Sequence, residues 1–143
     1  MKQILVAVDG SEVGNAAVET AAELAAKFGL PSVTLISVIP VAVSTIGVST
    51  TAAAPEDIEA WEAFDKPKQI LSRFGIQPKL LLKEGDPAAE IVAAAQDGGF
   101  DLIVVGHRGL SPIKAFLLGS VSDRVVSHAP CSVLVVRPAK QAS

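Results

Sequence analysis

Short, unbroken apolar runs alternate along this chain with longer segments in which apolar residues recur at three- and four-residue steps. The short runs are rich in β-branched residues, which is typical of strands covered on both faces, whereas the longer period is that of a helix with one buried face. Five strands alternating with four helices predict a parallel α/β sheet with helices on both faces and right-handed crossovers. The predicted strands are residues 4–8, 32–39, 78–82, 102–105 and 131–136, the third beginning with a proline typical of a sheet edge.

Capping residues mark the ends of the first and third predicted helices. The first helix follows the turn at residues 9–11 and ends before Gly29, where a positive φ suits a helix C-terminus. The third opens at Asp86-Pro87, a cap followed by proline at the first helical position, and stops at residues 98–99. The buried faces are predicted at Val13, Ala17, Ala21, Leu24 and Phe28 of the first helix and at Ala88, Ile91, Val92 and Ala95 of the third.

The other two helices carry a proline and a capping box. The second begins near Pro55 and runs toward Gly75, with Pro67 inside it. Because such a proline removes a hydrogen bond and clashes with the preceding turn, at about 3 kcal/mol, we expect a kink or two shorter pieces. The fourth helix opens at Ser120 with the Ser-x-x-Asp spacing of a capping box and extends to about His128.

Length, composition and charge bound the class of protein. The 143 residues are expected to form one domain, 1–143, because domains hold about 100–200 residues. Half of them are hydrophobic and 19% are charged, which predicts a folded core. The 12 Lys and Arg are scattered and face 15 Asp and Glu, a net charge of −3. This pattern argues against a nucleic-acid partner, which normally needs a basic face for the phosphates.

Neither a secretion signal nor a membrane span is expected. The apolar run at residues 4–8 is too short for the core of a signal peptide. The uncharged stretch 28–55 is interrupted by Pro40, Gly47 and eight Ser or Thr, whereas a span needs about 20 mostly apolar residues. Together with a single cysteine, Cys131, these features predict a cytoplasmic protein.

Several catalytic and nucleotide-binding motifs do not occur. The sequence contains no G-x-x-x-x-G-K-[ST] phosphate loop, no G-x-G-x-x-G and no G-x-S-x-G. Its two histidines and one cysteine lack zinc-type spacing. A phospho-receiver site would need a second acid beside Asp9 and an aspartate after the third strand, and Glu84 is the only candidate. We therefore assign no catalytic and no metal-binding residue.

A glycine-rich loop follows the fourth strand. Gly106 and Gly109 begin it, and after nine further residues Gly119 and Ser120 meet the N-terminus of the last helix. Glycine permits close backbone approach, and a helix N-terminus offers unpaired N–H groups to anions, so together they could hold a polyphosphate. A flexible loop followed by an ordinary N-cap is the alternative, and spacing alone leaves both open.

These residues resemble the universal stress proteins, whose nucleotide-binding members carry G-x2-G-x9-G-[ST]. Gly106, Gly109, Gly119 and Ser120 match this motif. Pro67 and the uncharged stretch 41–54, which has no periodicity, depart from the family pattern. The resemblance also covers residues 4–11, 85–87, 101–106 and 129–136, and so spans nearly the whole chain.

The resemblance implies a five-stranded sheet of order 3-2-1-4-5 with a site for ATP. Asp9 would accept hydrogen bonds from the ribose hydroxyls, since a carboxylate can accept from two. Ala7 and Val38 would line the adenine pocket, and Gly106 would lie under the ribose. The phosphates would be held by Gly109, Gly119, Ser120 and Val121.

Val8 and Arg108 also belong to the expected site, and a divalent metal ion would accompany the nucleotide. Val8, beside Asp9, is included in it, and Arg108 is included as a cation that could neutralise phosphate charge together with Lys114. A solvent-facing loop cation is the commoner interpretation of both. Mg²⁺ or Mn²⁺ would come with the nucleotide and be held mainly by its phosphates.

Plainer interpretations exist for several residues. Asp9 could only cap the first turn, because Asp is a favoured turn residue. Cys131 begins an apolar strand and is expected in the core. Trp61 and Phe64, three apart on a helix, are expected to pack. Neither histidine is assigned a catalytic role.

The sequence therefore predicts an ATP-binding protein that acts as a stress-response or signalling switch. Hydrolysis would be slow at most, because no general base is aimed at a phosphate. A partner-binding scaffold whose nucleotide site is vestigial, or prefers AMP or a cyclic nucleotide, is the alternative. An adenylate-chemistry enzyme would need a Ser-Gly-Gly loop or a His-x-x-His element, and neither occurs. The resemblance also implies a homodimer through the last strand, 131–136, whose uncovered edge would leave backbone groups unpaired.

Overall fold

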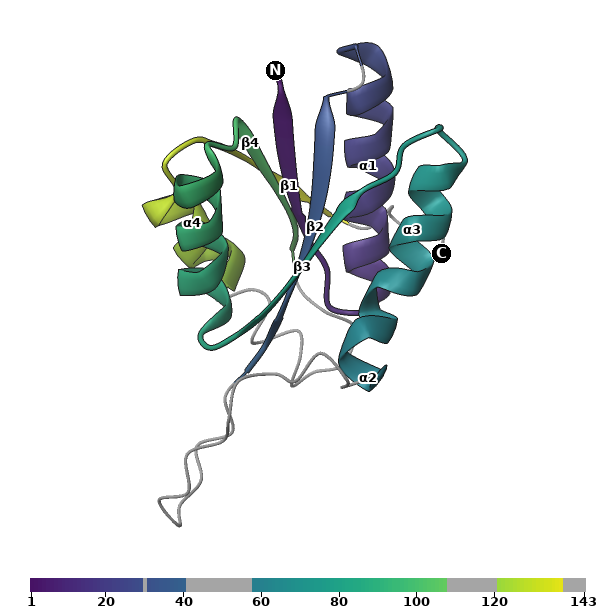
Figure 1. Ribbon diagram of the computed structural model, residues 1–143. Coiled ribbons are helices and arrows are strands. Elements are labelled where there is room, and N and C mark those ends of the chain that lie inside the picture. Colours follow the sequence, from purple (N-terminus) through teal and green to yellow (C-terminus); the bar gives the residue numbers. More distant parts are fainter. Residues whose placement is uncertain (30, 41–57, 108–120, 138–143) are drawn as a thin grey trace, which may run out of the picture.

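Five parallel strands form the sheet of this protein, here in a computed structural model that describes residues 1–29, 31–40, 58–107 and 121–137 (Figure 1). Their order is β3-β2-β1-β4-β5. The α/β class and the strand order predicted from the sequence are confirmed. The strands are β1 (Gln3–Ala7), β2 (Ser32–Ile39), β3 (Lys79–Glu84), β4 (Leu102–Gly106) and β5 (Ser132–Val136).

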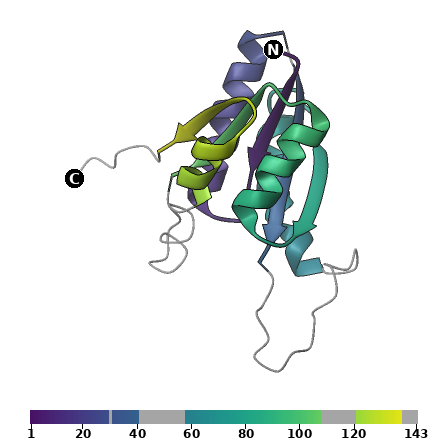
Figure 2. The same ribbon diagram turned by 90° about the vertical axis from the view of Figure 1, so that its left-hand side faces the viewer.

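Helices cover both faces of this sheet. On one face lie α1 (Glu12–Lys27) and α3 (Asp65–Ser72). On the other lie α4 (Pro87–Gly98) and the helix over residues 121–128, which Figure 2 shows in front of the strands. Within the described residues, no helix has the length and apolar character needed to span a membrane.

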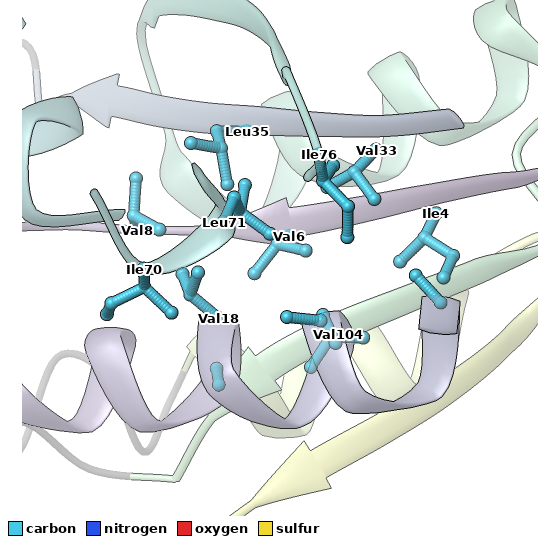
Figure 3. Packing of buried hydrophobic residues seen from close by; sticks show 14 of the residues in the cluster. Ile4, Val6, Val8, Val18, Val33, Leu35, Ile70, Leu71, Ile76 and Val104 are labelled. Atoms are coloured by element: carbon cyan, nitrogen blue, oxygen red, sulfur yellow. The ribbon is translucent and has the colours of Figure 1, made fainter. Parts of the chain in front are cut away.

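Strand β1 supplies side chains to two separate cores. It pairs with β2 on one side and with β4 on the other, all in parallel register. Ile4 and Val6 pack toward α1 and α3, whereas Leu5 packs toward α4, and all three are fully buried. Figure 3 shows Val6 close to Val18 of α1 and Val104 of β4 in the same cluster. The continuous apolar run in the sequence reflects this burial on both faces.

The predicted caps of α1 and α4 are present. Asp86 caps α4 by accepting a hydrogen bond from the N–H of Ala89 (2.9 Å), and Gly99 ends the helix with φ 65°. Gly29 follows α1 with φ 80°. Phe28, predicted on the buried face of α1, is instead 56% exposed. It is the C-cap residue, and its non-helical φ and ψ turn its side chain off that face.

The proline-containing helix forms separate pieces, as predicted. A short α2 (Ile58–Trp61) and a 3₁₀ turn, η1 (Glu62–Phe64), precede α3. The break lies before Pro67, which is the third residue of α3. Because the N–H groups of a first helical turn have no partner within the helix, a proline there loses no hydrogen bond. Trp61 and Phe64 pack as predicted, with their ring centroids 5.6 Å apart.

Strand β3 extends two residues beyond the predicted end. Lys83 and Glu84 continue its pairing with β2, opposite Val38 and Ile39. Their charges conceal this part of the strand in the sequence. An edge strand accepts such residues because one side of it has no neighbouring strand. The stretch 41–54, for which no element was predicted, lies outside the described residues.

Asp101 fastens the beginning of β1 to the loop before β4. Its Oδ2 accepts hydrogen bonds from the N–H groups of Lys2 (2.7 Å) and Gln3 (2.8 Å), and its own N–H donates to the Gln3 carbonyl at 3.0 Å. These bonds favour the ionised carboxylate and hold the pKa of Asp101 below its ordinary value, mainly through the Lys2 N–H.

We predict that Asp101→Ala lowers the urea midpoint of unfolding at neutral pH, because the two N–H groups lose their charged acceptor. A carboxyl group whose pKa is lowered by folding stabilises the protein above its unfolded pKa, and this contribution disappears as the pH falls through the folded pKa. The midpoint difference from wild type should therefore shrink between about pH 7 and about pH 2. Asp97→Ala, which removes another exposed carboxylate, is the control. A difference that is constant over this range would contradict the assignment.

Candidate functional site

A pocket of about 420 Å³ lies at the carboxyl ends of β1, β2 and β4. Strand order reverses here, since the chain leaves β1 for β2 on one side and later returns to form β4 on the other. Ligands of open α/β sheets bind at such reversal points. Pockets for small molecules occupy about 300–1,000 Å³, so the volume is suitable for one.

The pocket brings together predicted residues that are far apart in the sequence. Those that line it are Ala7, Val8, Asp9, Val38, Gly106 and Val121. Arg108, Gly109, Gly119 and Ser120, as well as Lys114, lie outside the described residues. The binding roles of all of them stay predictions.

The turn after β1 fixes the carboxylate of Asp9 at the pocket. Asp9 Oδ1 accepts a hydrogen bond from the N–H of Ser11 (3.0 Å), and Ser11 Oγ accepts one from the N–H of Gly14 (3.1 Å). A Cβ on Gly14 would lie 3.3 Å from Asp9 Oδ1, so a glycine here avoids a close contact with the carboxylate. Asp9 thus caps the turn, as its plainer interpretation holds, while the same side chain lines the pocket.

Packing alone requires a glycine at residue 106. A Cβ at this position would lie 2.5 Å from Cγ1 and 3.0 Å from the carbonyl oxygen of Val13 in α1. Gly106 is not among the glycines with a positive φ, so the requirement is steric. The sequence carried no signal for this contact, because Val13 was recognisable only as a residue of the buried helix face.

Two charged residues of the pocket, Asp86 and Arg124, form an ion pair that the sequence did not reveal. Arg124 Nη1 lies 2.9 Å from Asp86 Oδ1, and Nη2 lies 2.8 Å from Oδ2. The guanidinium and the N–H of Ala89 together hold the pKa of Asp86 below its ordinary value, with Arg124 the larger cause. Asp86 was recognisable as a cap, but 38 residues separate the partners, so no local pattern could connect them.

The remaining lining is largely apolar. Ile39 and Pro40 lie at the end of β2, and Ala60 and Ala63 belong to α2 and η1. Such residues offer apolar contacts to a ligand, while the carboxylates of Asp9 and Asp86 and the Arg124 guanidinium supply directional polar contacts. Within the part of the chain that is described, no three His, Cys, Asp or Glu residues gather where they could hold a metal ion.

The chain matches the family model described as universal stress protein family over residues 1–137. Universal stress protein YxiE of Bacillus subtilis is 32% identical in an alignment that covers 94% of this chain and 98% of that protein. Universal stress protein UspA of Lactobacillus plantarum superposes with a TM-score of 0.75 at 26% identity, covering 95% of this chain and 97% of that one. A universal stress protein in complex with cAMP superposes with a TM-score of 0.73 at 24% identity, covering 94% and 96% of the two chains.

We predict that Gly106→Ala destabilises the fold by about 1–3 kcal/mol, because the new methyl overlaps Val13. In the double variant Val13→Ala/Gly106→Ala, the clashing Cγ1 is absent. The double variant should therefore be less destabilised than the sum of the single variants, by at least about 0.5 kcal/mol. Urea unfolding of the four proteins measures this coupling. Additive effects would mean that the close contact does not limit residue 106.

Proposed function

Because this chain belongs to the universal stress protein family, we propose that it binds an adenine nucleotide, ATP, in the pocket at the carboxyl ends of β1, β2 and β4. The observation that carries the proposal is the convergence of predicted binding residues from four separate segments on one pocket of suitable volume. The sequence motif formed by Gly106, Gly109, Gly119 and Ser120 adds a means of holding phosphates.

The pocket offers a different chemistry to each part of the nucleotide. Ala7 and Val38 give the adenine ring an apolar seat, with Val8 next to them. The Asp9 carboxylate can accept hydrogen bonds from ribose hydroxyls. Val121 lines the pocket from the last helix, and N–H groups at the beginning of a helix favour anions.

The phosphate tail distinguishes ATP from smaller adenine nucleotides. The cAMP complex is a precedent for an adenine nucleotide on this fold, and the choice of ATP for this chain rests on its own glycine and serine residues. Mg²⁺ or Mn²⁺ would accompany the nucleotide and be coordinated mainly by the phosphates. Arg108, in the glycine-containing segment, is proposed as a cation that balances phosphate charge.

Occupancy by ATP, with at most slow hydrolysis, is proposed to act as a stress-response or signalling switch in the cytoplasm. Neither Asp9 nor Asp86 is free of other hydrogen bonds: Asp9 accepts from the N–H of Ser11 and Asp86 accepts from the N–H of Ala89. A carboxylate engaged in this way is a poor base for activating water. The second candidate, a scaffold with a vestigial site, is favoured only if the folded protein fails to bind nucleotide.

We predict that Asp9→Asn weakens ATP binding about tenfold, since one charge-assisted hydrogen bond to the ribose is lost. The amide oxygen of asparagine can still accept from Ser11, so the turn is retained. Glu12→Gln, an exposed acid of the first turn of α1, makes the same change of charge and should leave the affinity unaltered. Isothermal titration calorimetry with ATP measures the three proteins.

Dideoxy-ATP, which lacks both ribose hydroxyls, identifies the contact. Wild type and Asp9→Asn should bind it equally, and about as weakly as Asp9→Asn binds ATP. If Asp9→Asn weakens the binding of ATP and of dideoxy-ATP by the same factor, Asp9 acts on the turn and not on the ribose. Absence of heat at millimolar ATP with folded wild-type protein would contradict the proposed function.

We further propose a homodimer through the edge of β5. This strand pairs with β4 on one side, and Val133, Leu134, Val135 and Val136 are only partly buried. An apolar edge strand with unpaired backbone groups is stabilised by a second copy.

Light scattering coupled to size exclusion should give twice the mass of one chain at micromolar concentration. A monomeric mass throughout that range would refute the dimer.

A further inference from the structure

Arg124 is the one basic side chain among the described residues that line the pocket. The acidic ones are Asp9 and Asp86. A polyphosphate entering this pocket would meet two carboxylates, so the guanidinium is the group there that can balance its charge. The sequence motif for phosphate binding does not include Arg124, and neither does the set of residues predicted from it.

The guanidinium is already in the geometry that an anion requires. It donates two parallel hydrogen bonds to the Asp86 carboxylate, at 2.9 and 2.8 Å. A phosphate presents two oxygens to the same fork, and arginine suits both anions for this reason. Val121 also lines the pocket and stands three residues before Arg124, so both belong to one face of their helix.

The ion pair can be exchanged at small cost. The side chains of Arg124 and Asp86 are 50% and 46% exposed, and ion pairs with such access to water contribute little to stability. Asp86 would not be left without a partner, because its Oδ2 also accepts from the N–H of Ala89. Asp86 can therefore continue to cap α4 after the guanidinium has moved to another anion.

We propose that Arg124 is the phosphate-recognition residue of the pocket: Asp86 holds its guanidinium in the absence of ligand, and the guanidinium transfers to a phosphate group of the bound nucleotide. This inference rests on the proposed function and names a contact within the same site. Asp86 then competes with the ligand for Arg124, and so sets the affinity for phosphate-bearing nucleotides relative to adenosine.

A purely structural ion pair would behave differently. Suppose that Arg124 only stabilises the packing of the helix over residues 121–128 against the beginning of α4. Loss of either partner would then destabilise the pocket and weaken ATP binding. If Arg124 is transferred to phosphate, removing the charge of Asp86 releases it and strengthens binding. The two roles therefore predict opposite signs for a substitution of Asp86.

The test is isothermal titration calorimetry of ATP and adenosine with wild type, Arg124→Gln, Asp86→Asn and the double variant. Arg124→Gln should weaken ATP binding about tenfold, the loss expected for a hydrogen bond between charged groups, and leave adenosine unchanged. Asp86→Asn retains an oxygen that can cap α4 and should strengthen ATP binding about two- to fivefold, because a competing exposed pair is removed. This gain should be markedly smaller in the Arg124→Gln background, where only the repulsion between Asp86 and the phosphates is removed.

Matched controls separate the contact from net charge. Arg73→Gln, at the far end of α3, and Asp97→Asn, in the last turn of α4, repeat the two charge changes away from the pocket and should leave both affinities unaltered. Thermal unfolding followed by circular dichroism verifies that every variant is folded.

Each contrary result has a definite meaning. Weaker ATP binding by Asp86→Asn, or a gain of equal size without Arg124, overturns the transfer. If wild type binds ATP and Arg124→Gln binds it equally well, this inference is overturned but the proposed function is not. Absence of any ATP and adenosine binding by folded wild type overturns the proposed function and this inference with it.

Discussion

Strand β1 can bury its apolar side chains only if both faces of the sheet are covered, because Ile4 and Val6 point to one side and Leu5 to the other. This requirement produces the two helical layers seen in Figures 1 and 2. It also fixes the position of the pocket. With neighbours on both sides, β1 stands where the strand order reverses, and the polar turn that follows it at Asp9 must emerge at the carboxyl end.

Tight packing and an open pocket meet at this end of the sheet. Gly106 lets Val13 of α1 approach β4 so closely that a methyl group would not fit. The same glycine lines the pocket. Gly106 therefore contacts the core on one side and lines the pocket on the other. The presence of glycine at this position cannot be attributed to ligand binding alone. Asp9 has a similar dual position, because it caps a turn and lines the same pocket.

Features set by neighbouring residues could be predicted from the residue pattern itself, whereas the strand order and the meeting of distant residues at one pocket were predicted only through the family resemblance. The apolar runs indicated the strands, and Asp86 and Gly99 marked the ends of α4, because each depends on local backbone geometry. The end of β3 was not predicted because Lys83 and Glu84 are charged, and only their pairing with β2 identifies them as strand residues. The ion pair of Asp86 and Arg124 was missed for the same reason, since it depends on how two helices pack on one face.

The walls of the pocket come from segments that begin near residue 7 and end near residue 124. The site therefore forms only when the chain is folded, and a ligand of the pocket binds the native state alone. At a concentration of about 100 times its dissociation constant, such an occupant would add about 2.7 kcal/mol to the free energy of unfolding. Resistance of the chain to proteolysis, and hence its lifetime, would then follow the supply of that occupant.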